Sequence, residues 1–320
     1  MAVTEPAPTV ASVETRPVAA ACLMLLATVC YASMTLIARH LSGQVHAFEV
    51  LFFRNAFGLV IMLPWLLRLV QPGMLKAGRI GMHGLRAGFN SVSLGCWFLA
   101  VGMMPLADAT AITFTAPLWV TIFAALFLGE TVRARRWSAT VVGFVGVLII
   151  LRPGAADSGF DILTPGALLA LGAAASWAMT VIALRSLSRS EAPEAVMTWQ
   201  VLLMAPISLP AAAFFWTMPN LQELLWMGLL AAMATAGQLC HINALRLQDI
   251  TALQPIDFVK LPIIATLAFF LYAEVPTVWT FVGGVVVFVA ASYVSWREAR
   301  IKRGRAVAVP IVVNASAERP

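Results

Sequence analysis

The sequence predicts an all-α integral membrane protein, with ten transmembrane helices arranged as two inverted repeats of five helices each. Three observations lead to this prediction: the composition, the continuous apolar stretches and a similarity between the two halves. Of the 320 residues, 61% are apolar and 11% are charged, whereas a soluble domain carries roughly 25% charged residues. The mean hydropathy of +0.88 agrees. The composition therefore excludes a water-soluble enzyme and a disordered chain.

Ten apolar stretches mark the expected helices, because about 20 residues are needed to cross the hydrocarbon layer. The stretches are continuous rather than alternating, which excludes an outer-membrane barrel. Short connections between them favour a compact bundle without an extramembrane domain. The first stretch lacks a basic segment before it, so we expect a retained helix and not a cleaved signal peptide. The expected spans are 18–38, 46–67, 85–104, 106–128, 137–151, 163–184, 194–216, 221–244, 251–272 and 277–296.

The basic residues predict the orientation of these helices. With the N-terminus in the cytoplasm, 17 of the 21 lysines and arginines lie on the cytoplasmic side. Arg39 and Arg152 lie outside, and Arg54 and Lys260 fall within spans. This asymmetry predicts a multi-pass protein of the inner (plasma) membrane with both termini in the cytoplasm. It also explains the net charge of +6, so we expect a lipid bilayer and no nucleic acid as a partner.

The second half of the chain repeats the first at an offset of about 145 residues. CYASMTLIARHLS (30–42) aligns with SWAMTVIALRSLS (176–188), and FLGE (127–130) aligns with LYAE (271–274). Five spans per half is an odd number, so the second half must enter the membrane in the opposite direction. Inverted repeats of this kind are typical of secondary transporters, whose substrate site lies between the repeats near the middle of the bilayer.

The repeats divide the chain into four segments. We expect a cytoplasmic N-terminal tail at 1–17, a first repeat at 18–152, a second repeat at 163–297 and a basic cytoplasmic C-terminal tail at 298–320.

Two segments carry a resemblance to a known family. The first resembles the EamA repeat of the drug/metabolite transporter superfamily and consists of PLADATAITFTAPLWVTIFAALFLGETV (105–132) with RRWSATVVGFVGVLIILRPG (135–154). The second half repeats it more loosely from Asp249 to Gly284. Within it, HAFEVLFFRN (46–55) and PIDFVKLP (255–262) are similar to the S-adenosylmethionine-uptake branch. The resemblance implies two EamA repeats and a transporter. The same superfamily includes amino-acid exporters and riboflavin importers, so the resemblance leaves the substrate open.

Charges at bilayer depth are the strongest indication of a site, because each costs at least about 2.5–3.5 kcal/mol at the middle of a span. Arg54 lies in the second span, and Asp257 and Lys260 lie in the ninth. Asp257 and Lys260 are three positions apart and therefore share a helix face, where they either neutralise each other or bind substrate. The aligned positions of the other repeat are Trp199 for Arg54 and uncharged residues for the other two. This asymmetry favours a ligand site.

Further polar and aromatic residues at similar depth complete the candidate substrate site. The kinked ninth span also carries Gln254 just before Pro255. Packing within the bundle is the simpler interpretation for several of these side chains. Asp108 and Asp249 begin spans and are expected to cap helices instead. The full set of expected substrate-binding residues is Arg54, Asp257, Lys260, Gln254, Gln238, His241, Asn90, Thr113, Tyr31 and Trp177.

The predicted function is secondary transport of a small organic metabolite, S-adenosylmethionine or a related zwitterion, by alternating access. An amino-acid or metabolite exporter and a riboflavin-type importer are the alternatives on the same fold. A channel or a membrane-embedded enzyme is an alternative of a different class. No catalytic motif is present, and the four cysteines show no metal-binding spacing, so we expect no enzyme activity, no cofactor and no metal. We expect a monomer or a weak homodimer.

Overall fold

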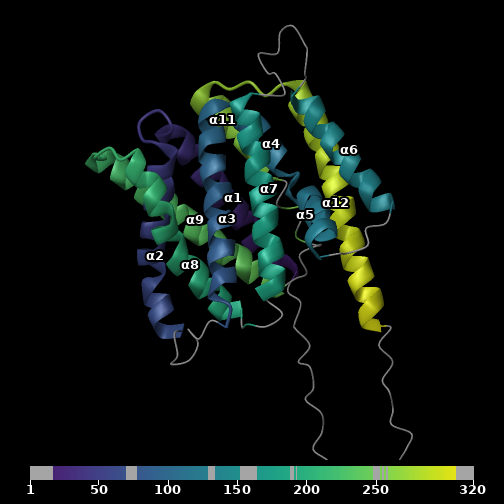
Figure 1. The fold of residues 1–320 in the computed structure, drawn as a ribbon. Helices are drawn as coiled ribbons and strands as arrows, with labels where there is room; N and C mark the ends of the chain where they lie inside the picture. The colour runs from purple at the N-terminus through teal and green to yellow at the C-terminus, as the bar shows by residue number, and fades with distance from the viewer. Residues whose placement is uncertain are drawn as a thin grey trace, which may run out of the picture.

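The computed structural model describes residues 17–69, 78–128, 134–151, 164–187, 191, 193–247, 253, 256 and 259–307. Its regular elements in these ranges are helices, as the apolar stretches predict (Figure 1). The first repeat contains α1 (Pro17–Leu41), α2 (Ala47–Leu69), α3 (Ile80–Met103), α4 (Leu106–Thr113), α5 (Ala116–Leu128) and α6 (Ala134–Leu151). The second contains α7 (Pro165–Leu187), α8 (Pro193–Phe214), α9 (Leu221–Leu247), α11 (Lys260–Tyr272) and α12 (Val278–Val307).

Six stretches in the described part of the chain are long and apolar enough to cross a membrane. They correspond to α1, α2, the α4–α5 pair, α7, α8 and α9. Shorter apolar helical segments lie at Trp137–Ile150, Lys260–Tyr272 and Val278–Tyr293. α3 has 24 residues, which is long enough to span, but it carries polar residues along much of its length. The structure thus supports a polytopic helical protein, and the count of ten spans remains a prediction.

The expected span at 106–128 is divided into two helices. α4 ends at Thr113, and α5 begins at Ala116. Pro117 lies in the first turn of α5, where its missing N–H breaks no helical hydrogen bond. Pro262 lies in the first turn of α11 in the same way. The two prolines therefore mark the start of a helix at matching points of the two repeats.

Asp108 lies in the first turn of α4, but it does not occupy the N-cap position as expected. The N-cap position of α4 is Pro105. The carboxylate of Asp108 accepts a hydrogen bond from the Thr280 hydroxyl of α12 at 2.5 Å. It therefore ties α4 to α12, while Asp249 lies outside the described residues.

The helix contacts are those expected of two repeats related by a two-fold axis. α1 packs along α9, and its counterpart α7 packs along α3. In the same way α2 contacts α9, and α8 contacts α3. Two further large contacts, α6 with α12 and α2 with α8, each pair a helix with its own counterpart. The middle of the bundle thus lies between helices of both repeats.

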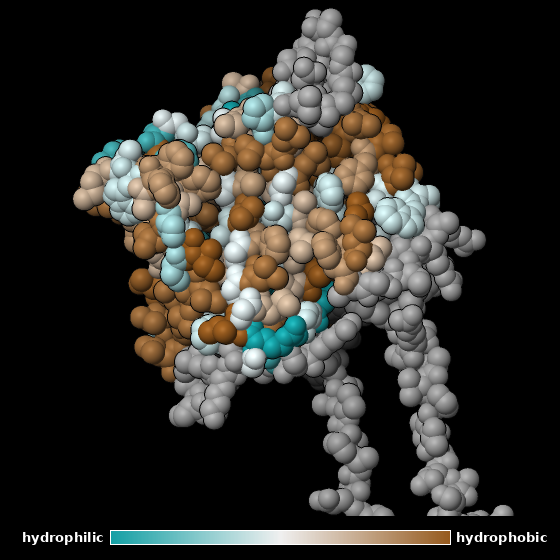
Figure 2. Space-filling model, viewed as in Figure 1, coloured by the Kyte–Doolittle hydropathy of each residue, from teal (hydrophilic) through white to brown (hydrophobic). Residues whose placement is uncertain are grey.

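We call the end of the bundle where α1 ends and α4 begins the upper end, as it is drawn in Figure 1, and the opposite end the lower end. α2 and α9 end at the lower end, and α8 begins there. Apolar side chains cover much of the visible described surface, with hydrophilic ones nearer the two ends (Figure 2). Large exposed residues such as Phe270 and Val285 belong to this apolar surface, which suits contact with lipid rather than water.

The α6–α12 contact depends on close approach of two backbones. A Cβ atom on Gly283 would lie 2.5 Å from the carbonyl oxygen of Gly146. A Cβ atom on Gly146 would lie 2.9 Å from the carbonyl oxygen of Gly283. Small residues at helix crossings are a common device in membranes, because close packing takes the place of the hydrophobic effect.

Candidate functional site

Arg54 places a positive charge two turns into α2. Its Nη1 donates a hydrogen bond to Asn55 Oδ1 at 2.8 Å. Its Nε is buried and has no hydrogen-bond partner. One of its donors is therefore still available to an acceptor.

Tyr31 and His241 lie together where α1 packs along α9. Their ring centroids are 6.4 Å apart. A Cβ atom on Gly237 would lie 3.1 Å from Cε1 of Tyr31, so the ring lies directly over the α9 backbone. Tyr31 and His241 thus bring a ring from each repeat together. Gln238 lies one turn before His241 on α9.

Carboxamide side chains from three helices surround Met204 of α8. Asn55 donates to the Met204 carbonyl oxygen at 3.4 Å and to Ser208 Oγ at 3.3 Å. Asn90 of α3 donates to Met204 Sδ at 3.3 Å, and Gln200 donates to the same sulfur at 3.1 Å. The oxygens of the Asn90 and Gln200 carboxamides are buried without a partner. This cluster adjoins Arg54 through Asn55.

A hollow of about 80 Å³ lies between α2, α8 and α9 in the lower half of the bundle. Gln238, Asn243 and Arg246 supply its polar groups. The remaining wall is apolar and consists of Met62, Met197, Val201, Leu239 and Ile242. Its polar groups sit on one helix of the second repeat, close to the lower end.

The other expected site residues are not shown to join this group. Lys260 Nζ lies 5.8 Å from the ring centroid of Trp97 on α3. Thr113 donates to the carbonyl oxygen of Thr110 in its own helix at 2.8 Å. Trp177, the aligned counterpart of Tyr31, is 47% exposed. Asp257 and Gln254 lie outside the described residues, so the pairing of Asp257 with Lys260 stays a prediction.

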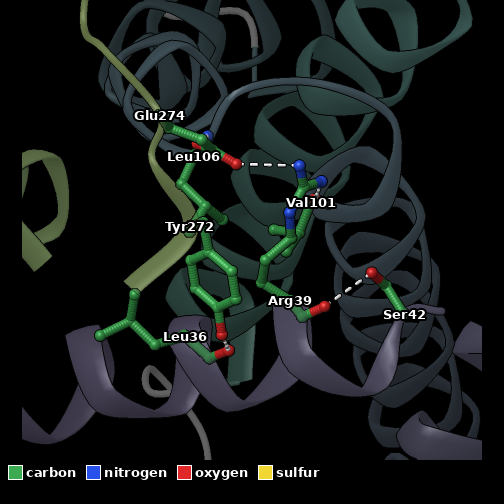
Figure 3. A network of polar contacts seen from close by, with 7 residues as sticks. All are labelled: Leu36, Arg39, Ser42, Val101, Leu106, Tyr272 and Glu274. Carbon is green, nitrogen blue, oxygen red and sulfur yellow. Dashed lines mark hydrogen bonds and ion pairs between the residues drawn. The ribbon is translucent and has the colours of Figure 1, made fainter. Parts of the chain in front are cut away.

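A polar network ties the two repeats together at the upper end (Figure 3). Arg39 Nη2 at the end of α1 forms an ion pair with Glu274 Oε1 at 2.8 Å. Glu274 Oε2 accepts a hydrogen bond from the backbone N–H of Leu106 at 2.8 Å. Arg39 Nη1 also donates to the carbonyl oxygen of Val101. Tyr272 donates from its hydroxyl to the carbonyl oxygen of Leu36 at 2.8 Å. The connection that follows α11 is thereby fastened to α1 and to the α3–α4 turn.

Sequence reasoning missed Asn55, Gln200 and Met204. A single carboxamide or methionine in an apolar stretch carries no signal that separates it from a packed residue. The internal repeat does contain a signal, because Gln200 follows Asn55 by the repeat offset of about 145 residues. A matched pair of carboxamides inside two apolar spans would have identified both positions.

A helical membrane protein with a polar cluster between two repeats has the architecture of a solute transporter. A family model described as the EamA-like transporter family matches residues 18–152 and 164–296. The chain belongs to the EamA-like transporter family.

Relatives of known function agree with this family. An S-adenosylmethionine uptake transporter of Rickettsia bellii is 31% identical over 86% of this chain and 92% of its own length. A riboflavin transporter of Vibrio cholerae is 29% identical over 93% of this chain and all of its own length. A solved structure entitled "Crystal structure of protein" covers 88% of this chain and 98% of its own, with a TM-score of 0.59 and 21% identity. It supports the fold alone. The protein is therefore a membrane transporter for a small metabolite.

Proposed function

We propose that this protein is a secondary transporter that carries a zwitterionic metabolite with a planar part across the inner membrane by alternating access. In this proposal the chain crosses the membrane ten times, and both termini lie in the cytoplasm. The 17 basic residues on that side support this orientation. The lower end of the bundle then faces the cytoplasm, and the upper end faces outward.

The observation that carries the proposal is the environment of Arg54. A guanidinium two turns into a span is costly, and the structure leaves its Nε buried without a partner. Buried donors in folded proteins usually have a partner, so the open Nε is a position that a ligand can fill. An anionic group of a substrate, such as a carboxylate, supplies the missing acceptor. Tyr31 and His241, which pair across the two repeats, offer ring surfaces for the planar part.

The relatives narrow the substrate class. S-adenosylmethionine and riboflavin both contain a planar nitrogen heterocycle, and their transporters resemble this chain to a similar degree. S-adenosylmethionine also carries a carboxylate, which suits Arg54, and positive charges, which suit the carboxylate of Asp257 expected from the sequence. We therefore take it as the first candidate. A riboflavin-type substrate and an exporter of related metabolites are the alternatives.

The two ends of the bundle differ in a way that supports alternating access. The Arg39–Glu274 network fastens the upper end, whereas the hollow lies in the lower half. A state that is closed outward, with space near the cytoplasmic end, is one of the two states that alternating access requires.

A thermal-shift screen of the detergent-purified protein tests the proposal. S-adenosylmethionine, amino acids, nucleosides and riboflavin are compared. A ligand at 100 times its dissociation constant stabilises a protein by about 2.7 kcal/mol. Arg54→Leu should abolish the shift produced by S-adenosylmethionine. Arg79→Leu, which removes an exposed arginine bonded to Ser186, should keep it. A full shift in the Arg54→Leu protein would remove Arg54 from the site. A shift with riboflavin alone would replace the first candidate by the flavin alternative.

A further inference from the structure

Two carboxamides between α3 and α8, buried Gln200 and partly buried Asn90, have partners too weak for their position. Asn90 and Gln200 each direct an N–H to the thioether of Met204, at 3.3 and 3.1 Å. A thioether sulfur is a weak acceptor. Both carboxamide oxygens are buried and have no partner. Leaving buried polar groups so poorly satisfied lowers stability. Folding alone therefore does not explain why these side chains are polar.

Met204 shares a face of α8 with residues that line the hollow of the lower half. Met197 and Val201 line the hollow. Met204 follows them at the i, i+4, i+7 spacing that places residues on one helix face. A methionine side chain is unbranched and flexible, and it fills irregular space at little cost. If its thioether turns aside, the hollow extends along α8 to the two carboxamides.

Asn55 fixes the position of the neighbouring charge. Its oxygen accepts from Arg54, and its N–H groups donate to Met204 and Ser208 of α8. The guanidinium of α2 is thus held beside the same turn of α8 that carries Met204. Arg54 and the two carboxamides are thereby joined through Asn55 and Met204.

We propose that Asn90 and Gln200 bind the edge of the substrate's planar nitrogen heterocycle, and that the Met204 side chain occupies the place of this ring in the substrate-free state. A carboxamide presents a donor and an acceptor side by side, which matches a ring edge with an adjacent acceptor and donor, as in the pairing of Asn or Gln with adenine. The inference rests on the proposed function and deepens it, because it names the residues that select the ring.

Equilibrium binding to the purified full-length protein tests this assignment. The two ligands are S-adenosylmethionine and S-methylmethionine, which keeps the sulfonium and the amino acid but lacks the ring. Gln200→Leu and Asn90→Leu should each raise the Kd of S-adenosylmethionine roughly tenfold, because each loses a buried hydrogen bond to the ring. The Kd of S-methylmethionine should not change. Met204→Ala should lower the Kd of S-adenosylmethionine, because no side chain then competes for the carboxamides.

Two control variants separate recognition from damage to the fold. Thr198→Val removes another buried hydroxyl of α8, and Met227→Ala removes a buried methionine of α9. Both should bind S-adenosylmethionine as the wild type does. If Gln200→Leu protein keeps the wild-type Kd for S-adenosylmethionine, or loses affinity equally for both ligands, the assignment is overturned and the proposed function is not. Met204→Ala protein that binds S-adenosylmethionine more weakly than Met227→Ala protein would do the same. Wild-type protein that binds neither S-adenosylmethionine nor riboflavin would overturn the assignment and the proposed function together.

Discussion

Replacing Glu274 by glutamine should shift the protein toward a state that is open at its upper end. Glu274 pairs with Arg39 at 2.8 Å and accepts from the Leu106 N–H at 2.8 Å, so it joins the second repeat to two parts of the first. The side chains of Arg39 and Glu274 are 24% and 14% exposed. The pair therefore lies between an exposed ion pair, worth about 0–1 kcal/mol, and a buried one, whose disruption costs about 3–5 kcal/mol.

We take about 1–2 kcal/mol as the cost of the change, because glutamine still accepts from Leu106 but removes the charge. This cost changes the ratio of closed to open molecules by about 5–30-fold. Where the open state holds about 1% of the wild type, the variant raises it to about 5–25%.

Electron-electron distance measurements between spin labels at Gln44 and Val275 report on this end directly. Both positions are exposed, and the four native cysteines are first replaced by alanine. The Glu274→Gln protein should show an increased fraction of long distances. Glu223→Gln is the matched control, because within the described residues the hydrogen bonds of Glu223 go to Asn220 in its own turn at the same end. Equal distance distributions in the wild type and Glu274→Gln would refute the reasoning.

Three further predictions follow from other parts of the chain. Glu49→Gln should lower the unfolding free energy by about 1–3 kcal/mol, because fully buried Glu49 accepts hydrogen bonds from the Thr217 N–H and hydroxyl. Thermal unfolding in detergent measures this change, and an unchanged melting temperature would contradict it. Gly283→Ala should destabilise the protein in the same assay, because the new Cβ would lie 2.5 Å from a main-chain oxygen of α6. Gly228→Ala should not, because a Cβ atom at Gly228 has open space around it. Equal effects of the two substitutions would count against close α6–α12 packing. If transport is coupled to a proton on Asp257, Asp257→Asn should abolish pH-dependent accumulation in vesicles but keep some counterflow, because counterflow needs no net proton movement. Wild-type pH dependence would leave Asp257 a structural residue.

Most of the fold follows from the sequence, because lipid imposes a simple rule. Backbone groups in hydrocarbon must be paired within a helix, so each long apolar stretch has one available structure. The division of the span at 106–128 is harder to place. Pro117 indicates a break, but a proline is tolerated throughout a first helical turn, and only the structure shows that α4 ends at Thr113.

The candidate site was predictable only in part. Arg54 is conspicuous in an apolar stretch because a charge there is costly, and its role in substrate binding stays a prediction. Asn55 and Gln200 carry no charge and are indicated only by their shared repeat offset, because single carboxamides also serve as packing contacts between membrane helices. Their relation depends on which helices cross at Met204, and that is a property of the three-dimensional packing.

The central claim is that this protein is a transporter of a small zwitterionic metabolite. Counterflow of labelled S-adenosylmethionine into proteoliposomes is its most direct test. Vesicles loaded with unlabelled S-adenosylmethionine should take up the labelled compound with saturable kinetics and faster than unloaded vesicles, and Arg54→Leu vesicles should lose this uptake. Flux that rises linearly with concentration and ignores the internal compound would indicate a channel, and chemical conversion of the label would indicate an enzyme. Either result, or equal uptake by protein-free vesicles, would contradict the account.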